Sequence, residues 1–156
     1  MSKRIFILLF SSFSILLFSC QDEYTICNQS KIIELKAKFY TNTAGTISAV
    51  NAPKLTLSTL DGVIIYNQQS NIPGFSTMLN PLIDSARYTI KIADNFQSDT
   101  ITIRYNSSSQ YLSPECGNIF IHNISSISLT HNTLDSIKIS TNAVNNTGVE
   151  NLRIFF

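Results

Sequence analysis

The chain is poor in the residues on which most catalytic and cofactor-binding motifs depend. Its 156 residues include no tryptophan, five glycines, four prolines, three cysteines and two histidines. His122 and His131 lie nine residues apart, so we expect each to be an ordinary strand or turn residue. No Gly-x-Ser-x-Gly sequence, glycine-rich phosphate loop, EF-hand loop or His-x-x-x-His spacing occurs. We therefore expect a protein that is not an enzyme, with no catalytic residues, no metal and no cofactor.

Charge is also scarce, since only 13% of the residues are charged. Beyond the N-terminal pair Lys3 and Arg4, the densest basic cluster is Lys36 and Lys38. No basic run is interleaved with aromatic residues as single-strand nucleic-acid binding requires. This composition argues against a nucleic-acid partner. The aspartates lie where turns enter or leave the expected strands, which is their ordinary position and does not indicate a glycosidase pair. These residues are Asp61, Asp84, Asp94, Asp99 and Asp135.

No segment of ten or more residues shows helical periodicity, and the pattern instead predicts strands. In residues 31–40, the apolar Ile33, Leu35, Ala37 and Phe39 alternate with polar or half-polar residues. A period of two places alternate side chains on opposite faces of a sheet. About ten such short runs, separated by Asn, Asp, Gly and Pro, predict an all-β, antiparallel β-sandwich with immunoglobulin-like or Greek-key connections. A barrel is the alternative.

Two hairpins are the most clearly predicted local elements. Residues 54–60 and 63–66 flank Asp61-Gly62, a dipeptide that favours a type I′ turn with positive φ at both central residues. Residues 86–93 and 99–105 form the second hairpin. Between and after them we expect a flexible serine-rich link at 106–110, and a tight turn at 113–117. The remaining expected strands are 118–122, 126–130, 135–140 and 149–156.

The N-terminus has the features of a secretory signal. Lys3 and Arg4 precede an apolar run over residues 5–18, which is shorter than the roughly 20 residues that a membrane-spanning helix needs. The run ends in Leu16-Leu17-Phe18-Ser19-Cys20, which resembles the bacterial lipobox. The resemblance implies cleavage after residue 19 and attachment of a diacylglyceryl group and an N-acyl chain such as palmitate to Cys20. An ordinary signal peptide followed by an incidental thiol is the alternative.

This signal sets the expected organisation and location of the protein. Residues 1–19 form the signal peptide, residues 20–30 the lipidated N-terminus and tether, and residues 31–156 one β-sandwich domain. Gln21-Asp22-Glu23 resembles the export signal of Bacteroidota lipoproteins, and a short solvated tether is its alternative. We expect the protein in the cell envelope, held in the outer membrane through Cys20, on either its periplasmic or its surface face.

The remaining two cysteines form an even pair. If Cys20 carries lipid, Cys27 and Cys116 lie together in an oxidising compartment, where we expect them to form a disulfide. Closing a loop of this size contributes about 4.5 kcal/mol in the chain-entropy model. Two buried free thiols are the alternative, and a metal site is less well supported because no ligand pair is closely spaced.

The whole pattern resembles an uncharacterised family of small Bacteroidota lipoproteins, a domain of unknown function. The features that carry the resemblance are the lipobox at Cys20, the nearby Cys27, the strand through Phe39, the turn at residues 113–117 and the closing strand at residues 152–156. The family has no assigned activity. The resemblance therefore supports the expected compartment and disulfide and implies no mechanism.

Two further patterns bear on function. Ser85, Thr100 and Ser136 each follow an aspartate and precede an apolar residue, a form that resembles the O-glycan acceptor of Bacteroidota envelope proteins. An aspartate that closes a turn before a strand is the alternative explanation. Tyrosines lie in or near several strands, where an exposed sheet face could stack sugars or peptides, although half-buried rings are the alternative. These tyrosines are Tyr40, Tyr66, Tyr88, Tyr105 and Tyr111.

From these observations the sequence favours a lipid-anchored envelope lipoprotein with a structural or protein-interaction role. A glycan- or peptide-binding β-sandwich is the alternative function, although the absence of tryptophan weakens a carbohydrate-binding interpretation. A hydrolase is the least supported class. The expected partners are the membrane, through Cys20, and an envelope protein or glycan that the sequence does not identify.

Overall fold

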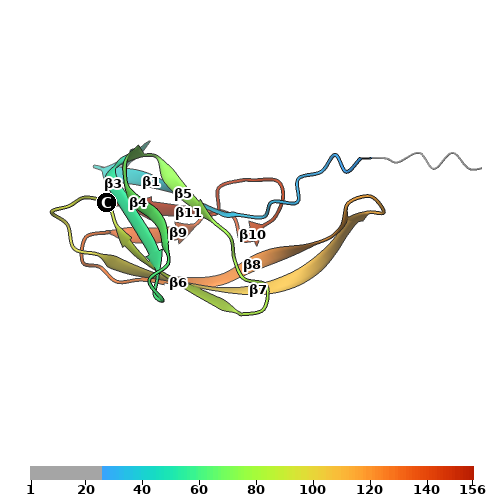
Figure 1. Cartoon of the computed structure of the whole chain (residues 1–156). Coiled ribbons are helices and arrows are strands. Elements are labelled where there is room, and N and C mark those ends of the chain that lie inside the picture. The colour runs from blue at the N-terminus through green and yellow to red at the C-terminus, as the bar shows by residue number, and fades with distance from the viewer. Residues whose placement is uncertain (1–25) are drawn as a thin grey trace, which may run out of the picture.

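The computed structural model describes residues 26–156, which form eleven strands and no helix (Figure 1). The predicted signal peptide and Cys20 lie outside the described residues. The strands are β1 (Leu35–Thr43), β2 (Thr46–Ala49), β3 (Ala52–Thr59), β4 (Ile64–Ile72), β5 (Gly74–Thr77), β6 (Ser85–Lys91), β7 (Asp99–Ser113), β8 (Gly117–Leu129), β9 (Ser136–Ile139), β10 (Ala143–Val144) and β11 (Leu152–Phe155).

The strands form two separate sheets. The first has the order β2-β1-β11-β9, and β5 also pairs with β1, on residues 35–38. The second has the order β10-β8-β7-β6-β3-β4, and each of its strands is antiparallel to its neighbours. The only parallel pair that the structure describes joins β1 to β11, so the closing strand is held in the sheet as predicted. Two packed, mainly antiparallel sheets confirm the predicted all-β sandwich.

The core consists of the predicted alternating rows. Leu35, Ala37 and Phe39 on β1 are buried, as are Ile101 and Ile103 on β7. The same apolar cluster includes Tyr88 and Ile90 on β6 and Ile92, which follows that strand. Burying alternate side chains from both sheets is what holds such a sandwich together.

The Asp61-Gly62 hairpin is confirmed, but the predicted type I′ turn is wrong. The N–H of Gly62 donates to the carbonyl of Thr59 at 3.1 Å, and the N–H of Thr59 donates to the carbonyl of Val63 at 2.9 Å. The loop therefore has three residues, and only Gly62, at φ +85°, needs the left-handed conformation. This is the form in which a glycine makes a bulge at the end of the turn.

The type I′ pattern of positive φ occurs instead at residues 44–45, between β1 and β2. Ala44 and Gly45 have φ values of +51° and +87°, and they join β1 to β2 as a two-residue loop. The following residue pairs at once, since Thr43 is opposite Thr46. Because a Gly at the second turn position tolerates this conformation at no steric cost, Ala44 is the only residue that is strained there.

The predicted flexible link at residues 106–110 is wrong. These residues belong to β7, which runs for 15 residues, and the two short strands expected at 118–122 and 126–130 are one 13-residue strand, β8. The outer halves of β7 and β8 pair with each other from Asn106 and Asn123 to Ser113 and Gly117. We call residues 106–123 the arm. It extends away from the body on the side where the N-terminal segment lies, whereas the C-terminus lies at the other side (Figure 1).

Candidate functional site

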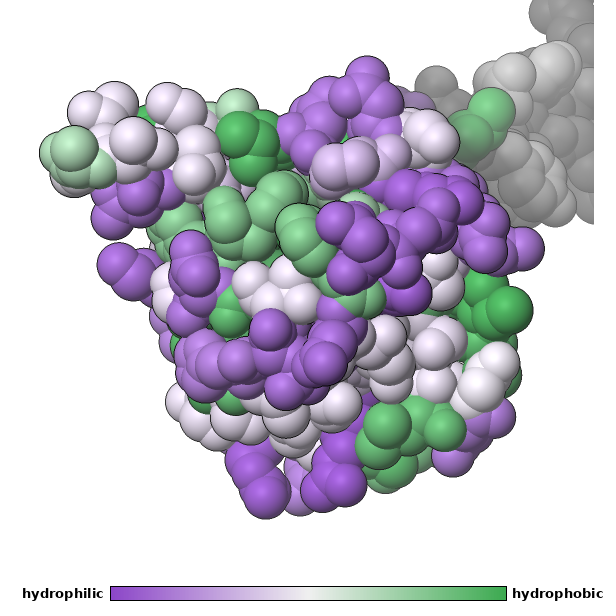
Figure 2. Space-filling view, turned by 90° about the vertical axis from the view of Figure 1, so that its left-hand side faces the viewer, coloured by the Kyte–Doolittle hydropathy of each residue, from purple (hydrophilic) through white to green (hydrophobic). Residues whose placement is uncertain are grey.

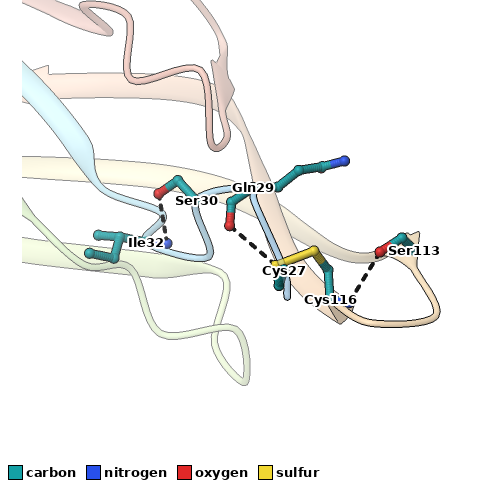
Figure 3. The surroundings of a disulfide bond; sticks show 6 residues. All are labelled: Cys27, Gln29, Ser30, Ile32, Ser113 and Cys116. Carbon is teal, nitrogen blue, oxygen red and sulfur yellow. Dashed lines mark hydrogen bonds between the residues drawn. A yellow bond between two sulfur atoms is a disulfide. The ribbon is translucent and has the colours of Figure 1, made fainter. Parts of the chain in front are cut away.

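The predicted disulfide joins the N-terminal segment to the tip of the arm (Figure 3). Cys27 and Cys116 are bonded, with their Cα atoms 4.9 Å apart and 89 positions apart in the chain. This confirms the predicted pair. Cys116 is buried in the turn between β7 and β8, where its N–H donates to the hydroxyl of Ser113 at 3.1 Å. The carbonyl of Gln29 lies 3.4 Å from the sulfur of Cys27, a contact without a donor because a disulfide sulfur carries no hydrogen.

The disulfide attaches the chain to the folded protein before the first strand begins. Residues 26–34 are in no strand, so β1 at Leu35 is the first strand that the chain enters. The bond at Cys27 attaches the chain to the arm eight residues earlier. The covalent link to the tip of the arm is therefore at the second residue that the structure describes.

Ser107 and His122 face each other across the base of the arm. The hydroxyl oxygen of Ser107 lies 2.8 Å from Nδ1 of His122, and the imidazole packs edge-on against the ring of Tyr105 at 5.4 Å. Burial lowers the pKa of His122, so the ring is neutral at pH 7. The pair links the two strands, and the prediction that His122 is a strand residue is confirmed.

Asp99 is a buried carboxylate that organises the loop between β8 and β9. It accepts hydrogen bonds from the hydroxyl of Thr130 and from the backbone N–H groups of Asn132, Thr133 and Leu134, all at 2.8–2.9 Å. Burial alone would raise the pKa of the Asp99 carboxyl, but these four donors outweigh it and hold the pKa below its usual range. The interpretation of this residue as an ordinary turn aspartate missed its anchoring role.

The tyrosines do not form one exposed face. Tyr88 and Tyr105 are in the core, where burial raises the pKa of both hydroxyls. Tyr40 is half-buried and donates to Glu150 at 2.6 Å, and Tyr66 is also half-buried. Of these five rings only that of Tyr111, on the arm, is exposed. The interpretation of these tyrosines as mainly buried or half-buried sheet residues is therefore confirmed for four of the five, and alternation turns Tyr88 and Tyr105 inward.

A hollow of about 370 Å³ lies between the β3–β4 turn and the segment that leads into β6. Its rim includes the exposed apolar residues Leu60, Met78 and Ile83, and its polar lining includes Asn80 and Arg87. The rings of Tyr88 and Tyr105 also line it.

The face of the molecule drawn in Figure 2 shows apolar patches that are small and separated by hydrophilic surface.

The three predicted O-glycosylation sites lie in the strands. Ser85 and Ser136 begin β6 and β9, and Thr100 is the second residue of β7. All three side chains are half-buried. The N–H of Thr100 also donates to the hydroxyl of Thr130 at 2.8 Å. Their glycosylation stays a prediction.

Within residues 26–156 no group of three or more His, Cys, Asp and Glu side chains is arranged to hold a metal ion. The same residues contain no helix that is long and apolar enough to cross a membrane.

Fold and disulfide together define a class of protein, a small all-β sandwich domain with a disulfide-bonded hairpin arm. The chain belongs to the Family of unknown function (DUF6452), which matches residues 46–156. The matched region begins in β2, so it includes Cys116 and leaves Cys27 outside. Searches of curated proteins and of solved structures found no match. The predicted membership of a family of unknown function is confirmed, while the Bacteroidota origin and the lipobox stay predictions.

Proposed function

We propose that the protein is a lipid-anchored lipoprotein of the cell envelope, whose β-sandwich has a structural or protein-interaction role at the outer membrane. The observation that carries this proposal is the bond between Cys27 and Cys116. Structural disulfides form in oxidising compartments, which supports export from the cytoplasm. Of the three cysteines this bond leaves only Cys20, the residue that follows the apolar run and the small Ser19. The thioether-linked lipid would then anchor the chain without help from the polypeptide.

The test is the location of the Cys20→Ser variant in native cells. We expect the wild-type protein in the membrane fraction and the variant in the soluble envelope fraction or retained as an uncleaved precursor. The Cys27→Ser/Cys116→Ser variant is the matched control, because it loses two sulfurs and keeps the lipidation site, and it should stay in the mature membrane form. A mature Cys20→Ser protein that sediments with membranes as fully as the wild type would overturn the proposal.

A second candidate function is the binding of a glycan or peptide in the hollow beside β6. Its mixed lining, with Arg87 and Asn80 near apolar Met78, is the observation that favours it. Met1 and Met78 are the only methionines of the chain, so Met78 gives an isolated NMR methyl signal in a protein that lacks its N-terminus. Titration with peptides and glycans released from the native envelope should shift that signal if the hollow binds them. An unchanged signal at saturating concentrations argues against this function.

A further inference from the structure

The arm and the N-terminal segment that the disulfide joins to it carry three large apolar side chains that are exposed. Tyr111 is 63% exposed and Phe120 is 50% exposed, and Ile26, the neighbour of the disulfide-bonded Cys27, is 84% exposed. In the β7–β8 register Tyr111 is opposite Asn118 and Phe120 is opposite Ser109. Paired residues share a face of an antiparallel ribbon, so Tyr111 and Phe120 lie on the same face, in neighbouring pairs of that face.

The arm is also almost without charge. Its residues 106–123 include one formally charged side chain, Glu115, and otherwise Ser, Asn, Gln, one histidine and apolar residues. Such a surface avoids the large desolvation cost of charges, and in the hydrated headgroup region its hydroxyl and amide groups can keep hydrogen-bond partners. Tyr and Phe are suited to a boundary between water and hydrocarbon, and Tyr in particular is enriched at both membrane interfaces.

The length of chain before the disulfide limits how far the arm can be from the anchor. Cys27 is seven positions after Cys20. At no more than about 3.6 Å per residue, the sulfur-bonded tip of the arm lies within about 25 Å of the lipidated residue. Without the disulfide the first attachment would be Leu35 at the start of β1, about 54 Å away at full extension. The bond therefore roughly halves the distance that can separate the arm from an anchor at Cys20.

We propose that this face of the arm docks on the lipid bilayer, with Tyr111 and Phe120 in the interfacial region and Ile26, next to the disulfide, close by. The inference rests on the proposed lipid anchor at Cys20, which supplies the high effective concentration that a small contact area needs. Docking of this face restricts the orientation of the whole molecule, because β7 continues from the arm to the opposite end of the body. Its 15 residues span about 50 Å, so the loop before Asp99, with Phe96, lies far along the strand from the proposed contact.

The experiment uses single tryptophan reporters in the lipidated protein, which is free of tryptophan background. Phe120→Trp reports on the arm, and Phe96→Trp, at an exposed ring beyond the other end of β7, is the matched control. Each variant is purified with its lipid and reconstituted into vesicles of phosphatidylethanolamine and phosphatidylglycerol. Part of the phospholipid carries brominated acyl chains, which quench tryptophan only at membrane depth. A flotation step measures anchoring in the same samples.

Docking predicts that the tryptophan of the Phe120→Trp variant has a blue-shifted emission and is quenched several-fold more than the tryptophan of the Phe96→Trp variant. If both variants float with the vesicles and their tryptophans are quenched equally weakly, the docking proposal is overturned and the lipid anchor stands. If purified protein carries no acyl chain and does not float, the proposed lipoprotein function fails, and the docking proposal fails with it.

Discussion

Asp99 shows how much a single side chain contributes to this fold. Among residues 26–156 it is the only acidic residue in the buried class, and its two oxygens accept four hydrogen bonds from the loop that connects the two sheets. A carboxylate can remain ionised there because each donor points a positive end at it. The sequence indicates a turn at this position, but the donors lie more than thirty residues away, so the anchoring role could not be predicted from local pattern.

Replacing Asp99 by asparagine is expected to lower the free energy of unfolding by about 3 kcal/mol, since an amide NH₂ would face backbone N–H groups that need an acceptor. Chemical denaturation followed by circular dichroism measures the change. Asp94→Asn is the matched control, because that carboxylate is largely exposed and bridges only to Lys54. It should shift stability by no more than about 0.5 kcal/mol. Equal effects of the two substitutions would contradict the role assigned to Asp99.

The lowered pKa of His122 predicts how the free energy of unfolding changes with pH. Burial lowers its pKa in the folded protein, whereas the unfolded chain has the ordinary value of about 6.5. The unfolded state therefore binds more protons just below that value. The stability contribution of the neutral ring is complete above about pH 6.5 and is lost as pH falls through the folded-state pKa.

We expect denaturation midpoints to fall between about pH 7.5 and about pH 5.5 in the wild type and to fall less in His122→Gln. The exposed His131 supplies the control, and His131→Gln should keep the wild-type pH dependence. A His122→Gln profile identical to that of the wild type would show that another group is responsible.

Strands whose apolar side chains alternate were predicted correctly. A strand that is held mainly by backbone hydrogen bonds was not. The rows on β1, β6 and β7 have apolar residues at every second position, so both their strand conformation and their buried faces were predicted. Residues 118–122 of the arm were predicted as a strand, but its other strand has Ser, Asn and Gln at residues 106–110, where no hydrophobic period marks it. Its ladder of backbone hydrogen bonds is independent of side-chain type, which is why a serine-rich segment was predicted to be flexible.

Removing the disulfide is expected to loosen the arm before the body. In Cys27→Ser/Cys116→Ser, amide hydrogen exchange should accelerate in residues 106–123 and leave β3 and β6 protected, because a two-stranded ribbon beyond the body has few other contacts to hold it. The chain-entropy model limits the loss of unfolding free energy to about 4.5 kcal/mol. Unchanged protection in the arm would mean that the strand ladder alone is sufficient.

For the whole molecule, composition and strand spacing were enough to predict an all-β sandwich in one domain-sized chain. The disulfide was predicted because two cysteines remain after Cys20 and the expected compartment is oxidising. Its location at the tip of a hairpin was not predicted, because no pattern in the sequence marks the arm as a projecting element. The hollow beside β6 was missed for a similar reason, since its rim combines the β3–β4 turn with the segment before β6. Such sites depend on how distant segments pack.

The central claim about the whole molecule is that Cys20 carries lipid while Cys27 and Cys116 hold the arm to the adjacent chain. Intact mass spectrometry of the protein purified from native membranes tests it most directly. The account predicts the mass of residues 20–156, two hydrogens short because of the disulfide, plus a diacylglyceryl group and an N-acyl chain. A polypeptide without acyl groups, or one that still begins at Met1, would contradict it.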